Sequence, residues 1–235
     1  MSASPDVRGG IGGWKTALLA GLGGAVIGAG AVALTSRQSV RDYLLEHPEV
    51  LPEAMQRLED RETAQVVRAN RAALETPFAG AWAGARAGDV VLVEFFDYAC
   101  GFCRKSNADV DRLLKEDAGL KVVWRDWPVL GPDSEAAAKA SLAAAKSGRF
   151  KPYHDAVFAA GRPAPQAVAA ARAGAGVGAD LAAQEIEAEL GRNFELARAL
   201  RSNGTPLFVV GDRVLRGAVG YEALKAAVAE ARKAA

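Results

Sequence analysis

The chain has 235 residues, half of them apolar and about a quarter charged, so a globular domain with a sizeable core can form. Its formal net charge is +1, and no basic run is interleaved with aromatic residues, which argues against nucleic-acid binding. Its 2 cysteines are too few for a structural disulfide framework and lie close together, so they point to redox chemistry or metal binding.

The N-terminal segment is dominated by an uncharged, largely apolar run over residues 16–36. As a helix this run would extend about 31 Å, which is enough to cross the hydrocarbon core of a bilayer. Residues 31–33 also match the small-x-small cleavage pattern of a signal peptide, behind a basic region that contains Arg8 and Lys15. Residues 1–37 are therefore predicted to be a signal peptide or a transmembrane anchor, and both interpretations stay open.

The next segment, residues 38–78, combines many charged side chains with one apolar stripe, which predicts an amphipathic helical extension. Pro48 is expected to divide it into a short helix and a longer one. The stripe needs a partner, either the body of the same chain or another copy bound through residues 38–74, and the pattern favours neither. The stripe consists of Val40, Tyr43, Leu44, Val50, Leu51, Met55 and Leu58.

A buried strand and a helix are predicted on either side of the cysteines. Residues 79–88 are small and contain glycine, which predicts a linker. Residues 89–98 are rich in valine and aromatic residues, which predicts a buried strand. This strand leads into the sequence CGFC, from Cys100 to Cys103, and a helix is expected over residues 104–115.

A second strand and a helical block follow. Residues 121–127 predict the strand, and the break at 131–134 offers Asp133 or Ser134 as the N-cap of the next helix. The alanine-rich block over residues 134–201 predicts several helices, because alanine has the highest helix propensity.

The C-terminal part predicts a β-hairpin and a final helix. Pro206 precedes a strand over residues 207–210, residues 211–212 form the turn, and residues 214–217 return as the second strand. An amphipathic helix is expected from Tyr221 to the end. This order of elements predicts a thioredoxin-like α/β fold with an inserted helical subdomain, preceded by an N-terminal hydrophobic segment and the helical extension.

The place of the cysteine pair, after a strand and at the start of a helix, suits thiol chemistry. Only a thiolate attacks a disulfide, and the unpaired N–H groups and dipole at a helix N-terminus stabilise an anion. Cys100 is therefore the candidate attacking sulfur, with a lowered pKa and partial exposure to solvent. Cys103, one turn deeper, is the candidate for resolving a mixed disulfide. Because Gly101 and Phe102 are uncharged, the couple is expected to be less oxidising than one with a histidine between the cysteines.

Two further residues are candidates for the same site. Glu94 lies inside the apolar strand, so we expect a raised pKa and a role as proton acceptor near Cys103; the alternative is a solvent-facing position at a strand edge. Pro206 follows Thr205, and a cis peptide bond there would direct backbone groups toward the cysteines; the alternative is an ordinary proline at the start of a strand. The residues assigned to packing or to the surface are Asp97, Tyr98, Trp127 and His154.

Metal binding is the competing interpretation of the cysteine pair. Zinc needs three or four protein ligands, and the histidines His47 and His154 lie far from the cysteines in the sequence. Copper(I) can be held by two thiolates alone, so a membrane-tethered copper(I)-binding thiol protein is the alternative function. A scaffold with incidental cysteines, acting through its N-terminal helices, is a third hypothesis. Neither a cofactor nor a zinc site is expected.

Three motifs, in this order, resemble the DsbA-like family of periplasmic thiol–disulfide oxidoreductases: FFDYACGFC at residues 95–103, WPVLGPDS at 127–134 and NGTPLFVVGDRVLRG at 203–217. The segment VRDYLLEHPEVLPEAMQRLE at 40–59 resembles the N-terminal helical extension of ScsC-type copper-tolerance members. The resemblance covers the chain from Val40 to its C-terminus, and the motifs are specific together rather than singly.

The resemblance implies a thioredoxin domain over residues 79–235, with the helical insertion at about 134–201 and a cis-Pro206. It implies Cys100 as nucleophile, Cys103 as resolving thiol and Glu94 as the buried acid. The candidate substrate-binding residues are Gly101, Phe102 and Thr205.

The resemblance also carries expectations about function and partners. It implies that the enzyme forms or isomerises disulfide bonds in cysteine-containing exported proteins, outside the cytoplasm, and that a membrane redox partner recycles its cysteines. In ScsC-like relatives the extension mediates oligomerisation, which favours a homo-oligomer formed through residues 38–74. The CGFC centre departs from the CPHC centre of typical DsbA oxidases, so isomerase and reductase activities stay open beside oxidase activity.

Overall fold

The computed structural model describes residues 39–178 and 183–234, and the chain divides into two units after Arg57. The predicted signal peptide or transmembrane anchor, residues 1–37, lies outside the described residues. Within the described ranges, none of the helices is both long and apolar enough to span a membrane.

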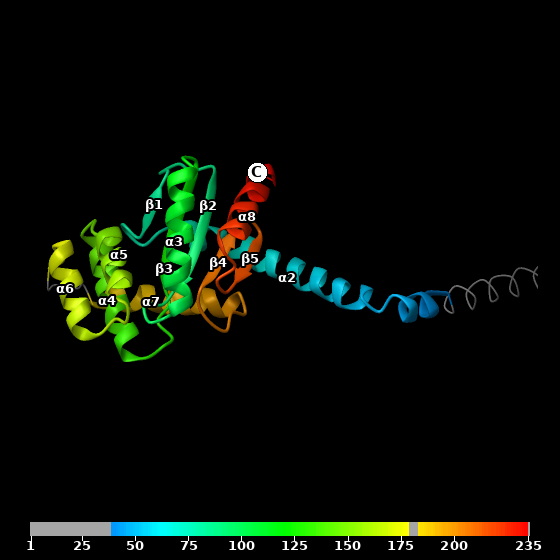
Figure 1. Ribbon diagram of the computed structural model, residues 1–235, viewed down its shortest axis with the longest axis horizontal. Coiled ribbons are helices and arrows are strands. Elements are labelled where there is room, and N and C mark those ends of the chain that lie inside the picture. The colour runs from blue at the N-terminus through cyan, green and yellow to red at the C-terminus, as the bar shows by residue number, and fades with distance from the viewer. Residues whose placement is uncertain (1–38, 179–182, 235) are drawn as a thin grey trace, which may run out of the picture. The chain divides into compact units, whose positions relative to one another are not determined.

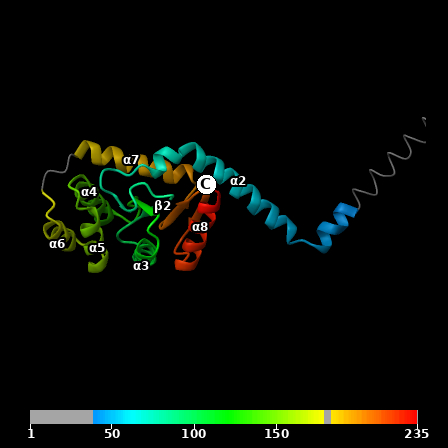
Figure 2. The same ribbon diagram turned by 90° about the horizontal axis from the view of Figure 1, so that it is seen from above.

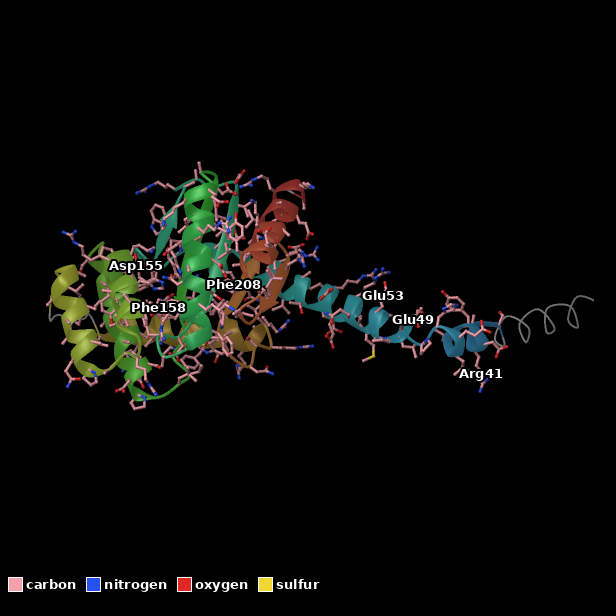
Figure 3. All side chains as sticks on the ribbon, viewed as in Figure 1. Arg41, Glu49, Glu53, Asp155, Phe158 and Phe208 are labelled. Carbon is pink, nitrogen blue, oxygen red and sulfur yellow. The ribbon has the colours of Figure 1, made fainter. Side chains whose placement is uncertain are left out.

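The first unit contains the start of the helical extension. Residues 39–46 are helical, and helix α2 (Val50–Glu75) begins after a turn at Pro48, which confirms the predicted division into a short helix and a longer one. Glu53, which is labelled in Figure 3, forms an ion pair with Arg57 one helical turn away, with 2.6 Å between Oε1 and Nη2. The residues of the predicted stripe that are more than half exposed in this unit are Val40, Tyr43, Leu51 and Met55.

The second unit is built on one mixed five-stranded sheet (Figure 1). Its strands are β1 (Trp82–Gly84), β2 (Val90–Phe96), β3 (Leu120–Asp126), β4 (Leu207–Val210) and β5 (Arg213–Arg216). Their order across the sheet is β1-β3-β2-β4-β5, so β2 is central, parallel to β3 and antiparallel to β4. The predicted strands and the hairpin are confirmed, and the prediction's alternative that Glu94 lies at a strand edge is wrong.

The prediction that residues 79–88 form a linker is also wrong, because they contain β1. This strand pairs antiparallel with β3, with Trp82 opposite Val123. The N–H of Trp124 donates to the carbonyl of the buried Ala81 at 3.0 Å, which extends the pairing by one residue. Three residues are too few for a period-two pattern to be recognised in a glycine-containing stretch.

Alternate side chains of the strands enter two separate cores, one on each face of the sheet. Helices α3 (Gly101–Glu116) and α8 (Tyr221–Ala234) cover one face, and α7 (Ala183–Ala199) covers the other with the C-terminal part of α2 (Figure 2). In β2, Leu92 and Phe96 belong to the first core, and Val93 and Phe95 belong to the second. Glu94 shares the parity of Leu92 and therefore points to the α3 face.

The predicted helical block is confirmed as the helices α4 (Pro132–Lys146), α5 (Phe150–Ala160) and α6 (Pro165–Ala175), followed by α7. Helices α4, α5 and α6 pack together beside the sheet, as Figure 1 shows. Side chains such as Phe158 of α5 and Phe208 of β4, both labelled in Figure 3, join the first core.

The predicted cap of α4 by Asp133 or Ser134 is wrong. The N-cap is Gly131, whose φ of 111° lies in the region that favours glycine, and Pro132 occupies the first turn. Ser134 is buried, and its hydroxyl donates to the carboxylate of Asp97 at 2.7 Å. A tertiary contact has therefore replaced the local capping bond.

A buried arginine joins the end of α2 and the helix α7 to the sheet. The guanidinium of Arg125, on β3, donates to Glu189 of α7 at 3.1 Å and to backbone carbonyls where α2 ends. These carbonyls belong to Ala73, Leu74 and Thr76. A cation at a helix C-terminus satisfies carbonyls that have no partner within the helix, so the last turn of α2 is fixed on the sheet.

Candidate active site

The two cysteines lie where the central strand β2 passes into α3. Cys100 is the N-cap residue of α3, and its carbonyl accepts the first helical hydrogen bond, from the N–H of Arg104 at 3.1 Å. Cys103 lies one turn into the helix, and both residues are free thiols. Cys103 is fully buried, whereas 7% of the surface of Cys100 is exposed, which is less than the sequence led us to expect.

The surroundings of the two sulfurs push their pKa values in opposite directions. The Cys103 thiol lowers the pKa of Cys100 from 9.0 to about 5, together with a hydrogen bond from the side chain of Thr205 and the backbone N–H groups of Cys103 and Phe102, while burial opposes the shift. Burial, the neighbouring Cys100 and the charge of Glu94 raise the pKa of Cys103. At neutral pH, Cys100 is therefore a thiolate and Cys103 a thiol, which is the state in which only the outer sulfur can attack.

The loop that precedes β4 lies against Cys100. The peptide bond between Thr205 and Pro206 is cis, which confirms what the resemblance to the DsbA-like family implied. When protonated, the thiol of Cys100 donates to the backbone carbonyl of Thr205 at 3.3 Å. Because β4 pairs antiparallel with β2, its first residues lie at the end of the sheet where β2 leads to the cysteines. Two segments that are about a hundred residues apart in the sequence thus meet at one sulfur.

Glu94 is buried on the same face of the sheet as the cysteines, with 2% of its surface exposed. Burial raises its pKa from 4.5 to about 8, even though the indole N–H of Trp124 donates to Oε2 at 3.0 Å. The negative charges of Asp111 and Cys100 raise it further, and Lys151 acts against them. With this pKa the carboxyl group is mostly protonated at neutral pH, and its ionised fraction can accept a proton.

The two residues between the cysteines differ from them in exposure. Gly101 is exposed, and Phe102 has 66% of its surface open to solvent. Both are therefore accessible to a bound molecule, whereas the sulfur of Cys103 below them is not.

Asp97 was predicted to be a packing or surface residue, but it binds the loops around the site. This buried carboxylate accepts four hydrogen bonds, from the N–H groups of Ala99, Val129 and Leu130 and the hydroxyl of Ser134. The signal was available, because Asp97 follows an apolar strand just as Glu94 lies within one, and the same cost of burying a carboxylate applies.

His154 and Tyr98, assigned to packing or the surface, are buried beside the site. The imidazole Nδ1 of His154 lies 3.2 Å from the hydroxyl of Tyr98, and Nε2 lies 3.0 Å from Oδ1 of Asn107. Burial lowers the pKa of His154, so it is neutral and packs among aromatic rings. In the part of the chain that the structure describes, no three histidine, cysteine or acidic residues gather as metal ligands.

Comparison with protein families matches residues 91–229 to the DSBA-like thioredoxin domain. The chain belongs to this family. Residues 37–65 match a second family, the copper resistance protein ScsC N-terminal domain, so the DSBA-like domain follows an ScsC-type extension. The resemblance inferred from the three sequence motifs and from the extension is confirmed.

Solved structures of an ScsC protein and of a thioredoxin-like oxidoreductase share this fold. A linker-deletion mutant of ScsC from Proteus mirabilis is 27% identical, with a TM-score of 0.72 over 85% of this chain and 94% of that one. A thioredoxin-like oxidoreductase from Silicibacter pomeroyi DSS-3 is 37% identical, with a TM-score of 0.61 over 66% of this chain and 92% of that one.

The curated relatives are much longer proteins. The Na(+)/H(+) antiporter NhaA 3 of Salinispora tropica is 31% identical over 156 residues, which make up 63% of this chain and 24% of the antiporter. The chain thus spans about a quarter of the length of the curated relatives that it matches.

The pKa of about 5 at Cys100 leads to a testable prediction about its reactivity. Because only the thiolate is nucleophilic, alkylation of Cys100 in the reduced protein should accelerate through pH 5 and reach a plateau below pH 7. Peptide mass spectrometry should locate the label on Cys100 and leave Cys103 unmodified. Replacing Cys103 with alanine should move the midpoint upward, since its thiol is the main cause of the shift. A wild-type midpoint close to 9.0 would contradict the prediction.

Proposed function

We propose that this chain is a thiol–disulfide oxidoreductase that forms or isomerises disulfide bonds in cysteine-containing exported proteins. The observation that carries the proposal is the contrast between the two sulfurs: an ionised Cys100 at the start of α3 and a protonated, buried Cys103 one turn away. A purely structural cysteine pair does not require its two sulfurs to differ in ionisation, whereas an exchange centre needs one attacking and one resolving sulfur.

The exchange has two steps. In the first, the Cys100 thiolate attacks one sulfur of a substrate disulfide, forming a mixed disulfide and releasing the other substrate sulfur as a thiolate. In the second, Glu94, once it has released its own proton, accepts the proton of the Cys103 thiol, and the sulfur of Cys103 attacks Cys100. The Cys100–Cys103 disulfide forms, and the second substrate sulfur leaves as a thiolate. Oxidation of a substrate dithiol runs the same steps in reverse, and isomerisation returns the substrate sulfur to a different partner.

Glu94 acts in the second step of the exchange, when the mixed disulfide is resolved. In the mixed disulfide the sulfur of Cys100 is neutral, so one of the charges that raise the pKa of Glu94 is gone. Glu94 therefore ionises more readily in the intermediate than in the reduced enzyme, at the step where Cys103 must lose a proton. Coupling of this kind favours the forward reaction without a change of conformation.

The partners and location form part of the same proposal. Disulfide exchange with exported proteins requires an oxidising compartment, so we assign the chain to the periplasm or another extracytoplasmic space, with a membrane redox partner that recycles the cysteines. We infer that the substrate chain binds beside Gly101, Phe102 and Thr205; contacts of Cys100 with Thr205 and with the backbone of Phe102 support this. Self-association through residues 38–74 stays a prediction, and the exposed apolar side chains in this segment support it.

Replacing each cysteine tests the proposed function. Purified wild-type protein should catalyse exchange with a model peptide disulfide, and Cys100→Ser should abolish the activity because the attacking sulfur is lost. Cys103→Ser should instead accumulate a mixed disulfide at Cys100, visible by non-reducing electrophoresis and mass spectrometry. A wild-type protein that binds copper(I) tightly through both thiols but turns over no disulfide would replace this proposal with copper binding.

Glu94→Gln tests the proton step, because glutamine keeps the volume and can still accept the Trp124 hydrogen bond. The mixed disulfide should persist about a hundredfold longer than in the wild type, the scale of one lost acid–base group. Wild-type release should rise with pH and level off at or below about pH 8, and the variant should lack this dependence. The first step should keep its rate. Equal lifetimes and parallel pH profiles in the two proteins would refute the role of Glu94.

A further inference from the structure

Asp97 joins the segment that leads to Cys100 to the loop that follows β3. It follows β2, and its backbone carbonyl accepts the N–H of Cys100 at 3.1 Å. Its Oδ1 accepts the N–H of Ala99 at 2.7 Å, within the cysteine loop, and the hydroxyl of Ser134 at 2.7 Å. Because only 1% of the surface of Asp97 is exposed, its carboxylate forms hydrogen bonds with these protein groups rather than with solvent.

The other oxygen of Asp97 holds the loop that joins β3 to α4. Oδ2 accepts the N–H groups of Val129 at 2.8 Å and Leu130 at 2.9 Å. The first residue of this loop is Trp127, whose backbone N–H donates to the carbonyl of Phe96 at 2.8 Å. Because β2 and β3 are parallel neighbours, their ends meet at one edge of the sheet, and Asp97 ties the two following loops together there.

The side chains on these fastened loops are apolar and point to solvent. Val129 is 41% exposed and Leu130 is 55% exposed, although the backbone of both residues is held by a buried carboxylate. Phe102, two residues after Cys100, is 66% exposed. Phe102 follows Cys100 in α3, and Val129 and Leu130 lie on a loop that Asp97 ties to the segment before Cys100. Exposed apolar side chains on a backbone fixed in this way form a surface that suits binding better than a mobile loop would.

We propose that Asp97 is a positioning residue for substrate binding: it holds Val129 and Leu130 beside Cys100, where they and Phe102 contact apolar residues that flank a substrate cysteine. The inference rests on the proposed function. The occupant is an extended, incompletely folded chain, because proteins that still lack their disulfides expose apolar side chains. The backbone N–H of Asp97 forms a hydrogen bond with Cys103, but its carboxylate touches no reacting atom in this scheme and acts through the loops that it holds.

A comparison of two substrates shows whether Asp97 positions the substrate-binding loop or only stabilises the fold. One is a peptide disulfide with leucine on both sides of its cysteine, and the other is oxidised glutathione, which has no apolar side chain to place on the loop. In Asp97→Asn, an amide N–H replaces one carboxylate oxygen and meets N–H donors, so part of the fastening is lost. The KM for the peptide should rise about tenfold, the scale of one lost charge-assisted hydrogen bond, with kcat and glutathione turnover unchanged.

Two more variants complete the test. Leu130→Ser removes part of the apolar surface and keeps Asp97, so it should raise the peptide KM without affecting glutathione, even if an Asp97 variant folds poorly. Asp133→Asn makes the same chemical change at an exposed position on the neighbouring helix turn and should leave both substrates unaffected. An equal loss on both substrates in Asp97→Asn, or an unchanged peptide KM in Leu130→Ser, would overturn the proposal. A wild-type protein that is inactive toward both the peptide disulfide and oxidised glutathione would overturn the proposed function, and this inference with it.

Discussion

The negative charge on the sulfur of Cys100 is the feature on which the rest of the site depends, and the fold supplies each group that stabilises it. The start of α3 provides the backbone N–H groups of Phe102 and Cys103, the same helix places the Cys103 thiol one turn away, and the loop before β4 contributes Thr205. Burial of the sulfur opposes ionisation, so these groups must outweigh desolvation. They do so because β2 lies between β3 and β4, and its end brings all of them to one place.

The same arrangement gives two chemically identical residues different exposure and opposite pKa shifts. Cys100 is the N-cap residue at the edge of the helix, whereas Cys103 faces the core with no exposed surface, where desolvation keeps its proton in place. Glu94 faces that core from the central strand and has a pKa raised to about 8 by burial. Groups whose environments separate their pKa values in this way can divide attack, proton transfer and release among themselves.

Features with a local signature were predictable, and features fixed by distant contacts were not. The strand before the cysteines, the helix after them and the hairpin after Pro206 follow from residue patterns only a few positions long. Ser134 was one of two candidate helix caps, beside Asp133, because capping is a local rule, but its hydroxyl is bound to Asp97, which lies 37 positions earlier in the chain. The partners of Asp97 on the loop after β3 were likewise out of reach, because only the parallel pairing of β2 with β3 brings them close. The limited exposure of Cys100 has the same origin, since the loop before β4 lies against it.

The reduction potential of the Cys100–Cys103 couple tests most directly whether stabilisation of the Cys100 thiolate governs the chemistry. A stabilised thiolate favours the reduced form of the enzyme and so makes the couple more oxidising. A pKa of about 5 lies between those of thioredoxin, about 7, and DsbA, about 3.5. The potential should therefore lie between their values of about −270 mV and about −120 mV, measured by equilibration with glutathione. A potential at or below about −270 mV would contradict the account, since the environment of Cys100 would then give the thiolate no special stability.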